Sequence, residues 1–150
     1  MLRILTLLTA ILVAPIWAQD MPDGAGKDTT VRVCTACHGA EMFAGTNKSA
    51  GDWDQTISSM TEKGMSINDA DYAVVLQYFS TCMGPATKKV NINKAVACEL
   101  TRILSLTQAQ ADAIVAYRTK NGDFKDLDSL KKVDGLDAAV VDSKKDSILF

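Results

Sequence analysis

The chain of 150 residues has little to offer as a general base, because His38 is its only histidine. No nucleophile–base pair of the kind used in covalent catalysis can be recognised. No glycine-rich dinucleotide-binding loop is present either. The scattered aspartates stand where helix caps and solvated surface are expected. We therefore expect this chain alone not to be an enzyme, although it could be a subunit of a redox enzyme complex.

Long hydrophobic runs are lacking beyond the N-terminus. Residues 1–18 have the pattern of a secretory signal peptide, with Arg3 before an apolar run at 4–13 and cleavage expected near Ala18. The run is too short for a comfortable membrane span, although an uncleaved N-terminal anchor is the alternative. We expect a mature protein that is periplasmic or otherwise exported, with no transmembrane anchor after signal removal.

A strong charge of one sign is also missing. Residues 19–84 contain nine acids against four bases, and residues 85–150 contain eleven bases against nine acids. A dedicated nucleic-acid-binding protein is expected to have a strongly basic surface. The charge pattern therefore gives no support to such a role.

What the chain does contain is Cys34-Thr35-Ala36-Cys37-His38, the C-x-x-C-H pattern of covalent c-type haem attachment. Two cysteines three residues apart lie about one helical turn apart on the same side of the backbone. Both sulfurs can then reach the two vinyl groups on one edge of a haem, and His38 can offer a ring nitrogen to the iron. The alternatives are a plain Cys34–Cys37 disulfide or a thioredoxin-like pair, which would need a βαβ context.

Cys82 and Cys98 remain after haem attachment. Two leftover cysteines usually pair in an oxidising compartment, so we predict a Cys82–Cys98 disulfide between the two halves of the chain. A buried free thiol or a bond to another chain is the alternative.

The spacing of apolar residues predicts three helices in the first half, after a mobile leader at residues 19–27. We expect caps at Asp28 and Asp52 and a capping box at 66–69. The polar stretch at 39–51 is expected to loop around the haem. A domain this small has little core of its own, and a bound haem would supply the missing burial.

The haem motif is followed by Trp53, Ile57, Met60 and Gly64 at fixed spacing, and by Asp-Tyr and Tyr-Phe pairs at 71–72 and 78–79. This order resembles a group of small bacterial monohaem cytochromes c over about 50 residues. The resemblance implies a cytochrome c-like domain at residues 19–85 that binds one haem c through Cys34 and Cys37. It implies His38 as an axial iron ligand and Met60 as the second, with Met65 or an open site as alternatives.

The second half has a helix–turn–helix order repeated twice, with expected caps at Asn93 and Thr107, a stop at Gly122 and a last helix from about Asp137. Its pattern is similar to the tandem helix-hairpin-helix domain of ComEA-like competence proteins. The similarity is carried by six segments: V-N-I-N-K-A at 90–95, C-E-L at 98–100, A-D-A-I-V-A-Y-R at 111–118, N-G-D-F at 121–124, L-D-S-L at 127–130 and V-D-G-L at 133–136. We therefore predict an all-α protein with a helix-hairpin-helix domain at residues 86–150.

DNA binding by such a domain depends on its hairpin turns. In the DNA-binding members, glycines leave backbone N–H groups free to hold a phosphate at the following helix N-terminus. Here the turn at 104–107 has no glycine, and Asp137 replaces the second glycine of the other turn. Lysines at 88, 89, 131, 132, 144 and 145 could still give weak, salt-sensitive contact. We expect a docking or packing module rather than a nucleic-acid-binding one.

These observations favour a periplasmic one-electron carrier with an unidentified redox partner protein. The first alternative is an extracytoplasmic ComEA-like DNA-binding protein with accessory haem. The second is a ligand sensor with five-coordinate haem. In the first of these readings, the acidic haem half would suit a redox partner with a positive patch.

Overall fold

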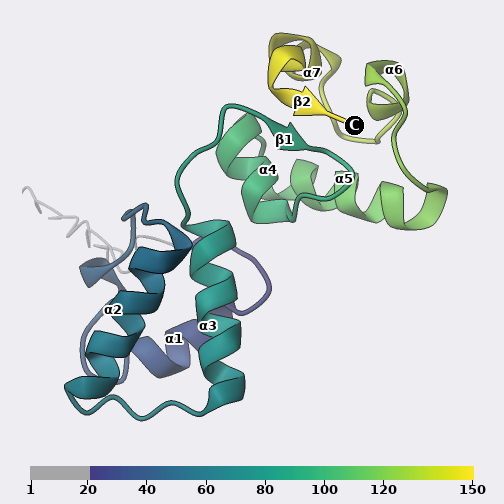
Figure 1. Ribbon diagram of the computed structural model, residues 1–150. Coiled ribbons are helices and arrows are strands. Elements are labelled where there is room, and N and C mark those ends of the chain that lie inside the picture. Colours follow the sequence, from purple (N-terminus) through teal and green to yellow (C-terminus); the bar gives the residue numbers. More distant parts are fainter. Residues whose placement is uncertain (1–20) are drawn as a thin grey trace, which may run out of the picture.

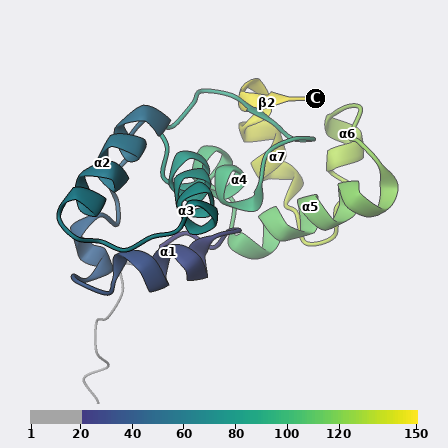
Figure 2. The same ribbon diagram turned by 60° about the horizontal axis from the view of Figure 1, so that its bottom comes forward.

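The computed structural model describes residues 21–150 and places them in two helical groups joined by a short connection (Figures 1 and 2). The expected signal peptide at 1–18 lies outside the described residues. The helices are α1 Lys27–Cys34, α2 Ala50–Glu62, α3 Asp69–Cys82, α4 Ala97–Leu104, α5 Gln108–Asn121, α6 Leu127–Leu130 and α7 Ala138–Ser143. Within residues 21–150, no helix has the length and apolar character that a membrane span requires.

Helices α2 and α3 begin at caps that differ by a few residues from those predicted. The N-cap of α2 is Ser49, whose hydroxyl accepts a hydrogen bond from the Asp52 N–H at 3.2 Å. Asp52 accepts in return from the Ser49 N–H, so it completes a capping box rather than capping the helix itself. The N-cap of α3 is Asn68, which accepts from the Asp71 N–H at 2.8 Å and replaces the predicted box at 66–69.

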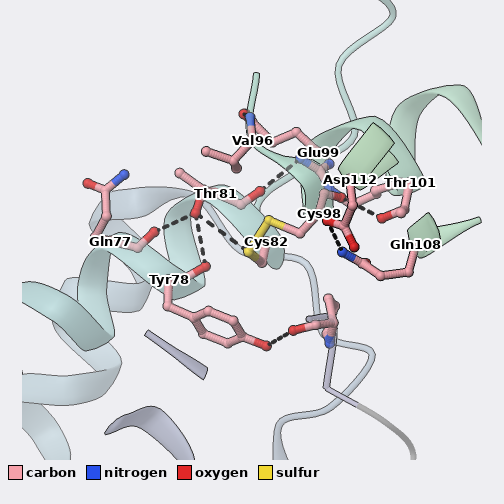
Figure 3. Close-up of a disulfide and its surroundings, with 12 residues drawn as sticks. Gln77, Tyr78, Thr81, Cys82, Val96, Cys98, Glu99, Thr101, Gln108 and Asp112 are labelled. Atoms are coloured by element: carbon pink, nitrogen blue, oxygen red, sulfur yellow. Dashed lines mark hydrogen bonds between the residues drawn. A yellow bond between two sulfur atoms is a disulfide. The ribbon is translucent and has the colours of Figure 1, made fainter. Parts of the chain in front are cut away.

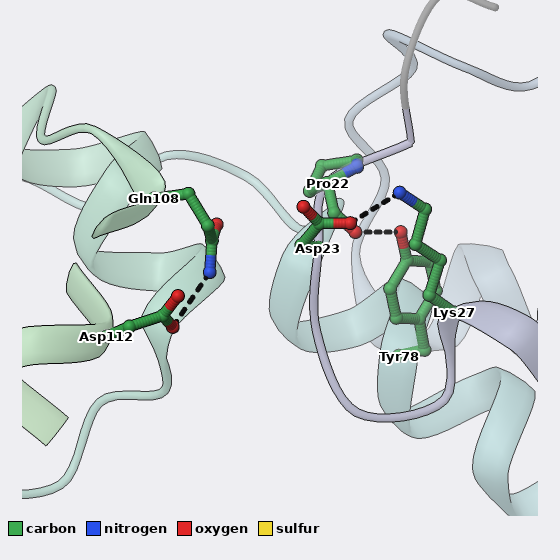
Figure 4. Close-up of polar contacts among 6 residues, drawn as sticks. All are labelled: Pro22, Asp23, Lys27, Tyr78, Gln108 and Asp112. Atoms are coloured by element: carbon green, nitrogen blue, oxygen red, sulfur yellow. Dashed lines mark hydrogen bonds and ion pairs between the residues drawn. The ribbon is translucent and has the colours of Figure 1, made fainter. Parts of the chain in front are cut away.

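The leader segment, predicted to be mobile, is packed against α3. Met21 is only 4% exposed, and the Tyr78 hydroxyl donates to the Pro22 carbonyl at 2.6 Å (Figure 4). Burial raises the pKa of Tyr78, which keeps the hydroxyl a donor at neutral pH. Helix α1 begins after Gly26, in the left-handed conformation, and the predicted cap Asp28 lies in its first turn. The prediction of a mobile leader was wrong because the residues that the leader packs against, such as Tyr78 in α3, lie far away in sequence.

A disulfide joins the two helical groups. Cys82 ends α3 and is bonded to Cys98 in the first turn of α4, which confirms the predicted pair (Figure 3). Both cysteines are buried within the hydrophobic core of the N-terminal domain. One turn further along α4, Arg102 donates to the Thr81 carbonyl at 3.2 Å. The two domains therefore meet where α3 ends and α4 begins.

The C-terminal domain contains two helix pairs, α4–α5 and α6–α7, around a core of its own (Figure 1). Thr107 caps α5 and Gly122 ends it, as predicted, and α7 begins after its cap Asp137, close to the predicted start. The all-α prediction needs one correction, because β1 (Val90–Asn91) pairs in parallel with β2 (Ile148–Leu149). Strands of two residues from opposite ends of a domain are too short to show a sequence period.

Asn93 does not cap α4, which begins four residues later. Its side chain instead exchanges two hydrogen bonds with the Phe124 backbone, at 2.9 and 2.8 Å. Arg118 holds the same segment from α5 by donating to the carbonyls of Ile92 and Ala95. The V-N-I-N-K-A segment is therefore a strap across the domain, which local cap statistics do not distinguish from a helix start.

Gly24 gives a test of the packing at the junction. A Cβ at this position would lie 2.7 Å from Cys82 Sγ and 3.3 Å from Cys98 Sγ, atoms that the disulfide holds in place. We expect Gly24→Ala to lower the free energy of unfolding by about 1–3 kcal/mol, as overpacking does elsewhere. The measurement is urea denaturation followed by circular dichroism.

Gly51→Ala is the matched control for this substitution. Gly51 lies exposed in the first turn of α2, and its Cβ would meet only Ser49 Oγ at 4.0 Å. We expect it to be neutral or to stabilise by up to ~1 kcal/mol, as an Ala in a helix does. Equal destabilisation by both variants would contradict the packing at the disulfide.

Candidate functional site

A cavity of about 470 Å³ opens among the helices of the N-terminal domain. Small-molecule and cofactor sites typically measure ~300–1,000 Å³. All three residues of the C-x-x-C-H pattern line this cavity, together with the two methionines predicted as iron ligands. Its remaining wall is mostly apolar and includes Val33, Phe43, Trp53, Ile57 and Phe79. The sequence predictions for the site therefore converge on one volume.

Helix α1 positions the attachment motif by ending inside it. Cys34 is the last residue of α1 and is partly buried, whereas Cys37 follows the helix and is exposed. The structure keeps both thiols free and does not form the alternative Cys34–Cys37 disulfide. His38 Nδ1 lies 3.3 Å from the Gly39 carbonyl oxygen. When Nδ1 donates its proton there, Nε2 is left with a free lone pair for a metal.

The sixth-ligand question stays open between Met60 and Met65. Both line the cavity and both are partly buried. They lie at the same end of α2, where the Met65 N–H donates to the Met60 carbonyl at 2.9 Å. Met42 also lines the cavity but is 69% exposed. Because both methionines line the cavity, these positions do not decide which of the two would be the second axial ligand.

Three aromatic rings form the apolar wall. Trp53 and Phe79 are stacked with centroids 4.1 Å apart, and Phe43 meets Phe79 edge-on at 5.6 Å. His38 in turn lies edge-on to Phe43 at 5.9 Å. Trp53 and Phe79 belong to the spacing that resembles small monohaem cytochromes c, whereas Phe43 lies outside it. Its signal is weak because it lies in the irregular stretch at 39–51.

That same stretch supplies polar side chains that the sequence did not reveal as site residues. Thr46 and Lys48 line the cavity from the loop, and Thr56 joins them from α2. The prediction that residues 39–51 loop around the site agrees with their lining positions. No periodic pattern marks these residues, because each reaches the cavity from irregular backbone or from the edge of a helix.

The cavity fits a haem better than a bare ion. Within residues 21–150, no three His, Cys, Asp or Glu side chains are grouped to hold a metal ion by themselves. Iron at His38 would therefore need ligands from a macrocycle, and two thiols stand beside that histidine on an apolar wall. Burial raises the pKa of Cys34 to about 11, so this thiol is protonated at neutral pH.

The hairpins of the C-terminal domain share one turn geometry. Ser105, between α4 and α5, is in the left-handed conformation with φ 57°, and Gly135, before α7, has φ 80°. Each is followed by a leucine that is 8% exposed, Leu106 or Leu136. The first hairpin thus keeps the turn without its glycine, at a cost of ~1–2 kcal/mol for a non-glycine residue in this conformation.

Side chains of the chain itself cap both hairpin helices. Thr107 accepts from the Gln110 N–H at 3.2 Å, and Asp137 accepts from the Ala139 N–H at 2.8 Å. These are N–H groups of the first helical turn, where a phosphate would otherwise bind. Asp137 also brings a negative charge to its helix start. The geometry therefore disfavours phosphate binding at either turn.

Comparison with known proteins identifies the C-terminal domain. Residues 85–148 match the helix-hairpin-helix motif family. ComE operon protein 1 of Bacillus subtilis is 39% identical over 59 residues, which cover 39% of this chain and 29% of that protein. These matches confirm the ComEA-like helix-hairpin-helix part of the prediction. Neither gives evidence for a cytochrome c domain.

Two further relatives differ in how much of them this chain covers. An uncharacterized protein of Haemophilus influenzae is 33% identical over 96 residues, which cover 62% of this chain and 85% of the relative. An endonuclease/exonuclease/phosphatase family domain-containing protein 1 of Rattus norvegicus is 38% identical over 58 residues, so the chain spans only 10% of its length. The comparison with solved structures found no match.

The two thiols that line the cavity should differ in reactivity. In protein made without haem, we expect iodoacetamide at pH 8 to label exposed Cys37 first and Cys34 at least tenfold more slowly. The reason is that the pKa of Cys34 is raised to about 11, so its thiolate fraction is small and grows about tenfold per pH unit up to that value. Peptide mass spectrometry measures both rates, and equal rates would contradict the burial of Cys34.

Proposed function

This chain belongs to the same family as the uncharacterized Haemophilus influenzae protein, and that relative's name gives no activity. From the cavity of the N-terminal domain, we propose that the protein is an exported c-type cytochrome that carries single electrons. The observation that carries this proposal is the convergence of Cys34, Cys37, His38 and two methionines on one apolar cavity. Nothing in the family comparisons supports electron transfer, so the proposal rests on the residues and their geometry.

The proposal gives each cavity residue a task. Cys34 and Cys37 would hold the haem by thioether bonds, His38 would bind its iron through Nε2, and Met60 or Met65 would bind opposite. Haem iron supplies a one-electron couple, and a methionine ligand raises its potential. The Gly39 carbonyl orients the imidazole by accepting from Nδ1, as such partners do in other metal sites.

The aromatic wall would keep water from the iron. The stacked Trp53 and Phe79 rings are 1% and 3% exposed, and Phe43 is 8% exposed. Burial of this kind controls solvent access and dielectric, and so the redox potential. The chain's own contribution to electron transfer is thus a dry, shaped site with two fixed anchors rather than a catalytic group.

A second candidate function is DNA binding, and the comparisons support it more directly than they support electron transfer. A ComEA-like helix-hairpin-helix domain covers residues 85–148, and the resemblance to competence proteins implies contact with duplex DNA. Haem would then be accessory. Against this stand the caps Thr107 and Asp137, which occupy N–H groups at both hairpin helices. Any binding should therefore be weak and dominated by lysine–phosphate contacts.

The haem proposal is tested by exporting the protein in a strain that attaches haem to C-x-x-C-H sequences. We expect one covalent haem by mass spectrometry and α and Soret bands of the c type. Cys34→Ser with Cys37→Ser should abolish attachment, whereas Cys82→Ser with Cys98→Ser should retain it. An exported wild-type protein with only the polypeptide mass would remove the proposal, and a high-spin spectrum with rapid carbon monoxide binding would indicate a five-coordinate sensor instead.

The DNA candidate is tested at Asp137. In a gel shift with duplex DNA at low salt, we expect weak binding by the wild type. Asp137→Asn keeps a side chain that can cap α7 but removes the negative charge. Because one repulsion of a DNA phosphate is lost, the affinity of this variant for duplex DNA should rise several-fold. The dependence of its affinity on salt concentration should change with the number of phosphates contacted. Asp146→Asn, outside the turn, is the control for charge alone. Absence of binding by all three proteins would dispose of this candidate.

A further inference from the structure

The cavity of the N-terminal domain is lined by two charged side chains, and both are lysines. They are Lys48, just before α2, and Lys63, just after it. No carboxylate lines the cavity; its other titratable groups are Cys34, Cys37 and His38. A cavity with cationic and no anionic lining is complementary to an acidic ligand group. A haem brings two propionate carboxylates.

The two lysines lie at opposite ends of the cavity. Helix α2 separates them with 13 residues, which corresponds to ~20 Å along the helix axis. The Lys48 N–H donates to the Met83 carbonyl at 3.3 Å, so Lys48 lies beside the end of α3. Lys63 precedes the loop that leads into the start of α3. They therefore cannot serve the same edge of one flat ligand.

Cys34 lies at the end away from Lys48. Two residues before it, Arg32 pairs with Asp71 in the first turn of α3 at 2.8 Å. The cysteine end of α1 is thus beside the start of α3, whereas Lys48 is beside its end, and α3 contains 14 residues. In a haem the vinyl groups that form thioethers and the propionates occupy opposite edges of the ring. Anchoring the vinyl edge at the cysteines directs the propionate edge toward Lys48.

Lys48 is held in place and has no acidic partner among the described residues. Its Nζ donates to Thr56 Oγ1 at 3.0 Å and lies 5.1 Å from the centroid of the Trp53 ring. No salt bridge to Lys48 occurs within residues 21–150. Thr46 and Thr56, which also line the cavity, donate their hydroxyl protons to the carbonyls of Phe43 and Asp52, at 2.7 Å each. The Lys48 ammonium has further protons to donate, and a positioned cation of this kind can bind a carboxylate at the rim of the cavity.

We propose that Lys48, positioned by Thr56, binds a haem propionate and so sets which edge of the haem faces the α2 N-terminus. This inference rests on the proposed function, because it assumes that the cavity holds haem. Lys63 lies at the thioether end and does not bind a propionate. The structure thus supplies its own matched control: the same side chain, on the same cavity, at the other end.

The experiment compares holoprotein of the wild type, Lys48→Ala and Lys63→Ala. Reduction potential is measured against pH, and resonance Raman spectra report the propionate bending mode. An adjacent cation lowers the pKa of a carboxyl group by about 1–3 pH units. In Lys48→Ala the propionate inflection should move to higher pH by about one unit or more, with a shifted bending mode. Lys63→Ala should leave both unchanged, and Lys48→Arg should restore the wild-type values.

Two further controls keep the outcome decisive. If Lys48→Ala does not accumulate as holoprotein, Thr56→Val removes only the hydroxyl that positions Nζ and should give a smaller shift in the same direction. Equal shifts in the Lys48 and Lys63 variants, or none in either, would overturn the assignment while leaving covalent haem intact. A wild-type protein without haem would instead refute the proposed function, so the two failures are distinguishable.

Discussion

Three short helices cannot close a core around themselves, and the N-terminal domain is shaped by that constraint. Trp53 and Phe79 stack against each other in its core, and a cavity of about 470 Å³ remains beside them. Interiors of folded proteins are normally close-packed, with few voids larger than a water molecule. A ligand bound in this cavity would fill the space that the side chains of so small a domain leave open.

Because the three helices bury little apolar surface, the N-terminal domain also packs against residues from the segments just before and after it in sequence. Cys98 belongs to α4, yet it is buried in the N-terminal core through its bond to Cys82. The leader contributes Met21 to that core and places Gly24 against both sulfurs. A disulfide restricts the unfolded chain and so stabilises a domain that buries little apolar surface. The junction thus stabilises the N-terminal domain, and it also fixes the position of the C-terminal domain.

In the C-terminal domain, the hairpin turns and the helix N-termini are formed by different groups of atoms. Ser105 adopts the left-handed turn that a glycine would adopt more easily, and the leucine after it is buried as in the second hairpin. Thr107 and Asp137 then satisfy the N–H groups at the helix starts. Membership of the helix-hairpin-helix family therefore predicts the hairpin geometry but does not by itself predict a phosphate-binding site. The turn depends on the backbone conformation, whereas phosphate binding depends on free N–H groups at the helix start.

Much of this protein follows from local sequence signals. The C-x-x-C-H pattern and the helix-hairpin-helix order depend on spacings of a few residues, and so do the cap at Thr107 and the helix end at Gly122. Shifted caps, as at Asp52, arose where two polar residues competed within one turn. By itself the sequence determined the attachment motif, the helical character and the pairing of the two remaining cysteines. Tertiary structure alone decided that the leader packs on α3, that Val90 pairs with Ile148 and that Lys48 and Lys63 end at opposite sides of one cavity. Those contacts join residues tens of positions apart, and no local period or propensity encodes them.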